Sequence, residues 1–382
     1  MKEKMIKLLY YIINPEITPE EKFNYKDLYP LYKFHSLEPF LDYARRLNLL
    51  DITKEELSSL SKIYQTALYK TAIQEEELNL IKKTFISNRI NFLPLKGSII
   101  RKTYPSLEMR TMADLDILVC KKEIKEVKKL MLNLGYKLVH EGGNHDVYHK
   151  LPFMNVEIHR NMIDESYVLS NYYKDIWHKT LKKEETTEYY LSIEDNYLYL
   201  IAHSAKHYGA GGTGVRSVLD IYFYLKCYPK MNETYLKNEL KKLDLVEYEM
   251  KLRALAFGWF AGEKLSLEEQ EVGDFIIKSG VYGTISHSLA SQLVNIDEGT
   301  RSLRYRKWRY LLSRAFPSFK LMKQLYPILK PLPILLPIFY IVRLFKGFFT
   351  GTIKTQTKEV RKLSENDILK HQKIKEKTRG KK

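Results

Sequence analysis

Between residues 90 and 160 the spacing of apolar residues changes from the period of a helix to that of short strands, and this change decides the fold class. On both sides of this segment the apolar residues recur at helical spacing. Inside it we expect two helices, at Gly97–Tyr104 and Lys121–Leu134, and five strands, at Ile90–Leu95, Asp114–Cys120, Tyr136–His140, Asp146–Leu151 and Asn155–Arg160. The sequence therefore predicts an α+β fold, with a small mixed β-sheet embedded in a mostly helical body.

The flanking segments carry ordinary helix signals. A long helix is expected from Thr53 to about Asn88, because Thr53 and Glu56 form a capping-box pattern. Five further helices are expected at Glu194–Tyr208, Val215–Cys227, Tyr235–Lys242, Glu247–Phe260 and Leu267–Ile277. We therefore divide the chain into an N-terminal helical region, the α/β core, a second helical region, a basic and apolar tail, and a charged flexible C-terminus, at residues 1–89, 90–165, 166–300, 301–353 and 354–382.

Composition narrows the class of protein. Hydrophobic residues make up 45% of the 382 residues, which is enough for a packed core. The only two cysteines, Cys120 and Cys227, exclude a disulfide scaffold and a cysteine-based zinc cluster. The first 21 residues have the pattern of an amphipathic helix and lack the cleavage site of a secretion signal. We expect a cytoplasmic protein.

The net charge of +17 is concentrated at the C-terminal end. Residues 301–382 contain 22 Lys and Arg against 4 Asp and Glu, so the preceding 300 residues are close to neutral. Within this end, residues 301–350 have 11 basic residues and no acidic one, and they enclose the apolar stretch Leu325–Phe349. Three prolines, at positions 331, 333 and 337, prevent one straight helix there.

Apolar anchors flanked by Lys and Arg are typical of segments that bind the surface of an anionic membrane. The same stretch, 325–349, could instead pack on the protein itself or on a partner, and its charge would also suit nucleic acid. No apolar run reaches the roughly 18 residues that a membrane-spanning helix needs. The tail is therefore expected to lie peripherally on the inner face of the membrane, with the other two readings left open.

The carboxylates of the α/β core are the most informative residues. Asp114 and Asp116 are two positions apart on an expected strand, so their side chains point to the same face. Glu157 interrupts another apolar strand in the same way. Adjacent like charges on apolar strands persist where a cation neutralises them, and oxygen ligands of this kind select Mg²⁺ or Mn²⁺. If the two strands are neighbours, the three carboxylates converge on one site.

A phosphate-binding segment is expected upstream of these carboxylates. Gly97 and Ser98 follow a short strand and open a helix, where backbone N–H groups and the Ser98 hydroxyl could bind a phosphate. Lys96 and Arg110 are nearby cations that could meet phosphate oxygens, and Arg110 is the one we favour. The alternative is that Arg110 pairs with an acidic residue and only orients it.

The order Gly-Ser, then Asp-x-Asp, then an acidic residue on a later strand resembles the nucleotidyltransferase superfamily of the DNA polymerase β type. The fuller strings LKGSIIRKTYPSLEMRTMADLDILV and NVEIHR are similar to one bacterial branch, the uncharacterised nucleotidyltransferase family. The later IAHSAKHYGAGGTGVRSVLDI and the apolar tail are also similar to that branch. The likeness covers most of the chain after about residue 50, and its sharpest motifs lie in residues 95–160.

The resemblance implies a Mg²⁺-dependent (or Mn²⁺-dependent) enzyme that transfers a nucleoside monophosphate from a nucleoside triphosphate to an acceptor hydroxyl. Asp114, Asp116 and Glu157 would hold the metal ions, and Glu157 would also accept the proton. The acceptor stays open between a protein, an RNA, a sugar and a small molecule. Two alternatives are a catalytically silent nucleotide-binding or membrane-peripheral scaffold and a toxin-like enzyme that modifies transfer RNA.

Three histidines are candidates for contact with substrate. His159 lies two residues after Glu157 and is expected on the same face of its strand. His203 and His207 are one helical turn apart and share a face, although packing is the commoner role for such a pair. They lack an evident third soft ligand for zinc.

Overall fold

The computed structural model describes residues 1–165, 167–281, 285–296, 302–349, 352–365, 368, 369 and 372. The chain divides into two compact units. The first comprises residues 1–206 and 214–281, and the second comprises residues 207–213 and 282–382. The five regions predicted from the sequence divide the chain more finely than these two units do, and that division stays a prediction. Residues 373–382, which belong to the predicted flexible C-terminus, lie outside the described residues.

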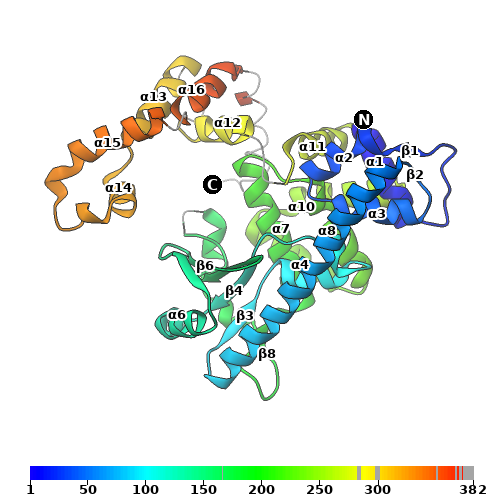
Figure 1. Ribbon diagram of the computed structural model, residues 1–382, viewed down its shortest axis with the longest axis horizontal. Helices are drawn as coiled ribbons and strands as arrows, with labels where there is room; N and C mark the ends of the chain where they lie inside the picture. Colours follow the sequence, from blue (N-terminus) through cyan, green and yellow to red (C-terminus); the bar gives the residue numbers. More distant parts are fainter. Residues whose placement is uncertain are drawn as a thin grey trace. The chain divides into compact units, whose positions relative to one another are not determined.

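The first unit contains a five-stranded mixed sheet (Figure 1), as the sequence predicts. Its strands are β3 Phe92–Pro94, β4 Leu115–Val119, β5 Lys137–His140, β6 His145–Lys150 and β7 Met154–His159. They are ordered β3-β4-β7-β6-β5, and the central pair β4 and β7 is parallel while all other neighbours are antiparallel. Each strand lies within the segment expected for it or begins one residue before it.

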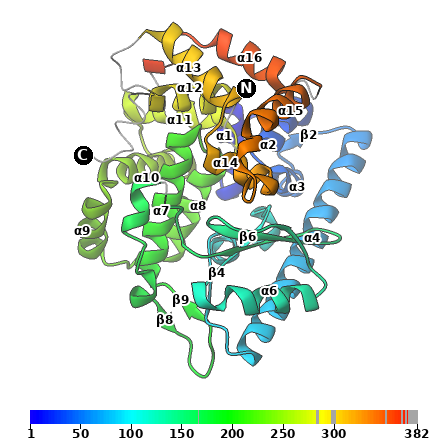
Figure 2. The ribbon, with the colours of Figure 1, turned by 90° about the vertical axis from the view of Figure 1, so that its left-hand side faces the viewer.

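The core of this α/β layer lies on one face of the sheet. The long helix α4 Lys54–Ser87 and the helix α6 Ile124–Asn133 lie along this side (Figure 2). Alternate strand residues point toward them, and the buried cluster includes Ile117, Val156 and Tyr148 from three successive strands. Because strand side chains alternate, the residues between these apolar positions point to the opposite face. The expected capping box of α4, between Thr53 and Glu56, is confirmed.

Helices form most of the first unit. They are α1 Lys2–Ile13, α2 Tyr25–Phe34, α3 Glu38–Arg46, α5 Gly97–Ile100, α7 Ile193–Ala210, α8 Val215–Cys227, α9 Glu233–Leu243, α10 Val246–Phe260 and α11 Leu267–Ser279, with α7 running into the second unit. Short 3₁₀ turns lie at η1 Arg101–Thr103, η2 Leu107–Met109, η3 Lys121–Glu123, η4 Val168–Asn171 and η5 Ile176–Lys179. Two small sheets pair β1 Phe23–Asn24 with β2 Leu50–Asp51, and β8 Leu181–Lys182 with β9 Tyr189–Tyr190. The predicted α+β class with a mostly helical body is confirmed.

The second unit contains its own small core. Helices α12 Ile285–Ile296, α13 Leu303–Ala315 and α16 Thr352–Lys362 share a buried cluster that includes Leu293, Tyr310 and Val360. Between α13 and α16 the chain forms α14 Phe319–Leu325, η6 Pro327–Leu329, η7 Pro333–Leu335 and α15 Leu336–Phe349. One straight helix is absent from this described stretch, as expected: the chain is broken around Pro331 and Pro333, whereas Pro337 lies in the first turn of α15. No helix in the described part of the chain is long and apolar enough to cross a membrane.

A buried histidine joins three helices of the first unit. His35, at the C-terminus of α2, is fully buried. Its Nδ1 accepts a hydrogen bond from the backbone N–H of Val215 at 3.2 Å, so its Nε2 carries the proton that is donated to the Ile277 carbonyl at 3.1 Å. Burial lowers the pKa of His35 to about 4, although the hydrogen bond to Ile277 opposes this shift.

Because of His35, we expect the protein to become less stable in mild acid. The unfolded chain binds a proton on His35 below its ordinary pKa of 6.5, whereas the folded chain does so only near pH 4. The contribution of His35 to the free energy of unfolding should therefore fall by about 2 kcal/mol between pH 7 and pH 5. Urea unfolding at both pH values would measure it, and the fall should be smaller in His35→Gln. The exposed His178→Gln is the matched control and should keep the wild-type difference.

Candidate active site

The carboxylates face one another across the parallel pair of strands. Asp116 on β4 is directly opposite Glu157 on β7, so the two side chains leave the sheet side by side. Both point away from the apolar core, because their neighbours Ile117 and Val156 point into it. For Asp116 and Glu157, the convergence predicted on condition that the strands are neighbours is therefore found.

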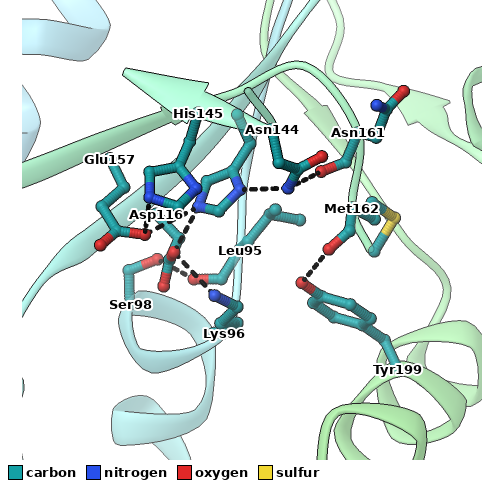
Figure 3. A network of polar contacts seen from close by, with 11 residues as sticks. Leu95, Lys96, Ser98, Asp116, Asn144, His145, Glu157, Asn161, Met162 and Tyr199 are labelled. Carbon is teal, nitrogen blue, oxygen red and sulfur yellow. Dashed lines mark hydrogen bonds and ion pairs between the residues drawn. The ribbon is translucent and has the colours of Figure 1, made fainter. Parts of the chain in front are cut away.

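Asp116 is the most buried and most strongly paired of the three carboxylates. Its Oδ1 accepts a hydrogen bond from Lys96 Nζ at 2.7 Å and lies 2.6 Å from His159 Nε2 (Figure 3). Burial alone would raise the pKa of Asp116, but the charge of Lys96 and the hydrogen bond from His159 outweigh it and hold this pKa well below its usual range. Asp116 is therefore ionised over the whole physiological range.

Asp114 is in a different electrostatic state. It lies immediately before β4 and is half-buried. Burial, and after it the charge of Asp116, raise the pKa of the Asp114 carboxyl to about 6. Two carboxylates so close together, with pKa values displaced in opposite directions, are typical of sites that bind cations or move protons.

The turn after β3 brings Lys96 to the carboxylates. Lys96 adopts a left-handed backbone conformation with φ of 48°, which is unfavourable for a residue with a side chain. Gly97 follows at a point of close approach, since a Cβ there would lie 2.6 Å from Met112 Sδ. The Ser98 hydroxyl donates to the Leu95 carbonyl at 3.0 Å and is buried. Phosphate binding by Gly97 and Ser98 stays a prediction.

Arg110 has a carboxylate partner that the sequence did not indicate. Its guanidinium is buried and donates two hydrogen bonds to Asp220 on α8, at 2.7 and 2.8 Å, while the Tyr104 hydroxyl donates to the same carboxylate at 2.6 Å. This bidentate pair agrees with the alternative in which Arg110 orients an acidic residue. Arg101, the other arginine of this segment, is fully buried and pairs with Glu75.

A model of the uncharacterised nucleotidyltransferase family matches residues 21–261, which is more than half of the chain. The chain belongs to this family. No curated protein and no solved structure gives a significant match. The matched segment of this family member includes the whole five-stranded sheet and helices α2 to α10, and it ends before the second unit resumes at residue 282.

Two histidines surround Glu157 in this nucleotidyltransferase-family protein. Glu157 Oε2 lies 3.6 Å from His145 Nε2 and 3.3 Å from His159 Nε2, and the three side chains could together hold a metal ion. The hydrogen bond from His159 lowers the pKa of Glu157. His145 was not among the residues predicted to contact substrate or metal. A hairpin centred on residue 152 pairs positions 145 and 159, and that symmetry was the signal that could have found it.

These residues fit a divalent cation by the chemistry of their donor atoms. Asp114, Asp116 and Glu157 offer the oxygen ligands that Mg²⁺ prefers. The neighbouring imidazoles add nitrogen donors, which suit transition metals better than they suit Mg²⁺. The Lys96 ammonium and the His159 imidazole both contact the Asp116 carboxylate, and His159 can bind a metal only when its imidazole is neutral.

Helix α7 contributes further side chains near the carboxylates. Tyr199 donates a hydrogen bond to the Met162 carbonyl at 3.1 Å, and the ring of His203 lies 6.1 Å from the Tyr199 ring. Lys206, two turns after Tyr199, is close enough for Lys96, Asp116 and Glu157 to affect its pKa, which burial lowers. Sequence reasoning missed Tyr199 and Lys206, since nothing in their spacing marks them.

The predicted contacts of the α7 histidines with substrate remain untested. His203 belongs to the first unit with the sheet, whereas His207 belongs to the second. His159, the third predicted histidine, is buried and lies directly against Asp116 and Glu157.

Proposed function

We propose that this protein transfers a nucleoside monophosphate from a nucleoside triphosphate to an acceptor hydroxyl. The acceptor oxygen forms a bond to the α-phosphorus, the bond from that phosphorus to the bridging oxygen of the β-phosphate breaks, and pyrophosphate leaves. The observation that carries the proposal is the side-by-side placement of Asp116 and Glu157 on parallel strands, with Asp114 beside them, in a member of a nucleotidyltransferase family.

The carboxylates would hold divalent ions, Mg²⁺ or Mn²⁺. When bound, such ions neutralise the triphosphate and make the acceptor hydroxyl more acidic. Asp114 and Asp116 would take the ion that accompanies the triphosphate, and Glu157 would share a second ion with them and receive the hydroxyl proton. His159, which contacts both Asp116 and Glu157, would hold these two carboxylates in place.

Cationic side chains would receive the phosphates. Lys96 is already at the site, and Lys206 approaches it from α7. The Gly97–Ser98 turn would supply backbone N–H groups, as predicted from the sequence. Arg110 is bound to Asp220, so its role in phosphate binding is proposed only as secondary to that of the two lysines.

We also make more specific proposals about the superfamily of the protein, its acceptor and its location in the cell. Membership of a bacterial branch of the polymerase-β-type superfamily rests on the Gly-Ser, Asp-x-Asp and V-E-I-H motifs. A protein, an RNA, a sugar and a small molecule are all compatible acceptors, and we propose a cytoplasmic location. The rival functions are a silent nucleotide-binding scaffold and a toxin-like enzyme that acts on transfer RNA.

Transfer of label from α-phosphate-labelled nucleoside triphosphates tests the proposal. Each common triphosphate is incubated with Mg²⁺ or Mn²⁺, with the protein alone and with a cell lysate as acceptor. Label should appear on protein, RNA or a smaller molecule, and the labelled species identifies the acceptor class. Absence of transfer with every nucleotide, both metals and lysate would favour the silent scaffold. Label confined to transfer RNA, with growth arrest on expression, would favour the toxin-like enzyme.

Removal of the Lys206 charge should weaken triphosphate binding. Lys206→Met is expected to lower kcat/KM about 10–100-fold, mainly through KM, because a charge-assisted hydrogen bond contributes about 1.5–3 kcal/mol. Burial already disfavours the charged form of Lys206, so the variant should fold as well as wild type. Lys206→Arg keeps the charge and is the control. An unchanged KM in Lys206→Met would show that this lysine does not contact the nucleotide.

A further inference from the structure

The second unit exposes an unusual concentration of apolar side chains. Residues 316–346, which run from the end of α13 to α15 and are called here the C-terminal hairpin, project from the three-helix bundle of α12, α13 and α16 (Figure 1). Eleven large apolar side chains of the hairpin are each more than one-third exposed. Soluble proteins rarely leave such a patch uncovered unless it binds something.

The exposed apolar side chains lie on one face of α15. On the inner face, the Tyr340 hydroxyl donates to the Pro317 carbonyl at 2.7 Å, and the ring of Phe339 lies 4.8 Å from that of Tyr326. On the outer face, Ile338 and Ile341 are each 55% exposed and Phe345 is 62% exposed. These outer residues are spaced by three and four, so they form a single stripe along the helix. The hairpin is therefore packed on one side and open on the other.

The charge of the hairpin limits what can cover this stripe. The hairpin contains five basic residues and no acidic one. Lys330 and Lys346, which precede and follow the stripe in the sequence, are exposed. These cations favour a negatively charged partner. Nucleic acid offers negative phosphates, but it lacks a large apolar surface that could cover the isoleucine and phenylalanine side chains. An anionic lipid surface offers both an apolar layer and negative headgroups in the same plane.

The dimensions of α15 agree with a helix that lies in a membrane surface. A helix of 14 residues is roughly 21 Å long, whereas the hydrocarbon core of a bilayer is about 30 Å thick. We propose that the C-terminal hairpin binds anionic membranes, with the outer stripe of α15 inserted among the headgroups and Lys330 and Lys346 on lipid phosphates. This attachment is independent of the proposed catalytic activity, since it uses no residue of the carboxylate site.

Sedimentation of the full-length protein with vesicles tests this inference. Vesicles of phosphatidylcholine mixed with phosphatidylglycerol should bind the protein, and vesicles of phosphatidylcholine alone should bind it much less. Ile338→Gln/Ile341→Gln/Phe345→Gln should weaken binding to the anionic vesicles by at least about tenfold, because these side chains lose their burial in lipid. Lys330→Gln/Lys346→Gln should weaken it about fivefold for each charge removed.

The matched controls change exposed residues of the first unit that have the same chemical character. They are Leu132→Gln/Met250→Gln/Leu267→Gln for the apolar stripe and Lys122→Gln/Lys237→Gln for the charges, and both should bind as wild type does. Wild-type protein that stays in the supernatant with anionic vesicles overturns the inference. So does equal binding of the apolar variant and its control. Binding to an RNA oligonucleotide but not to anionic vesicles would assign the basic hairpin to nucleic acid and overturn the lipid proposal.

Discussion

Replacing Asp116 by asparagine is expected to lower the rate of nucleotidyl transfer about a thousandfold, because a lost metal ligand removes several kcal/mol of charge stabilisation from the transition state. The same change should also destabilise the fold. Lys96 and His159 both contact the buried Asp116 carboxylate, so the variant leaves the partly buried Lys96 ammonium without its charged partner, at a cost of about 1–3 kcal/mol. Loss of activity by Asp116→Asn must therefore be read together with its unfolding curve.

The variant Asp114→Asn distinguishes a loss of catalytic rate from a loss of folding stability. The pKa of the Asp114 carboxyl is raised to about 6, so the fold already disfavours its charged form and a neutral amide should be tolerated. We expect Asp114→Asn to unfold at the wild-type urea concentration and yet to lose transfer to a similar extent as Asp116→Asn. Wild-type transfer by a fully folded Asp114→Asn would contradict the proposed role of this pair.

The second large effect is expected at the buried ion pair between α8 and the segment before β4. Asp220→Asn leaves the Arg110 guanidinium buried against a neutral amide, which should lower the free energy of unfolding by about 3–5 kcal/mol. Replacing the whole cluster by apolar residues of similar size, in Arg110→Met/Asp220→Leu/Tyr104→Phe, should recover most of this loss, because no polar group is then left unpaired. Urea unfolding of the three proteins measures both effects.

This series also decides between the two roles of Arg110. If the apolar triple variant is stable but does not transfer nucleotide, Arg110 contributes to phosphate binding as well as to packing. If it is stable and active, Arg110 only positions its surroundings. A wild-type unfolding free energy for Asp220→Asn would contradict the importance of the pair itself.

Secondary structure followed closely from local sequence. The period of apolar residues indicated the strands at 115–119 and 154–159. The same signal, together with a capping pattern at its start, indicated the long helix at 54–87. The segment at 97–104, expected to be helical, is divided between a four-residue helix and a 3₁₀ turn. The chain leaves the helical conformation at Tyr104, whose ψ is 153°, because the residue before a proline, here Pro105, disfavours the helical backbone.

The carboxylates of the site could be found from the sequence, but most of their partners could not. Acidic residues interrupt the apolar strands at Asp114, Asp116 and Glu157, and such an interruption can be recognised in the sequence alone. His145 depends on the register of a hairpin, and Lys206 depends on where α7 lies against the sheet. Both depend on contacts between residues that are distant in the sequence, and no local sequence pattern reveals such contacts.

By itself, the sequence determined the fold class, the acidic site and the segregation of positive charge to the tail, because periodicity and charge are properties of neighbouring residues. Only the tertiary structure decided that β4 and β7 are parallel neighbours, that Arg110 belongs to Asp220, and that one face of α15 is left open. Each of these depends on which surfaces are buried together when distant segments pack. That choice is made by the free energy of the whole fold and not by any segment alone.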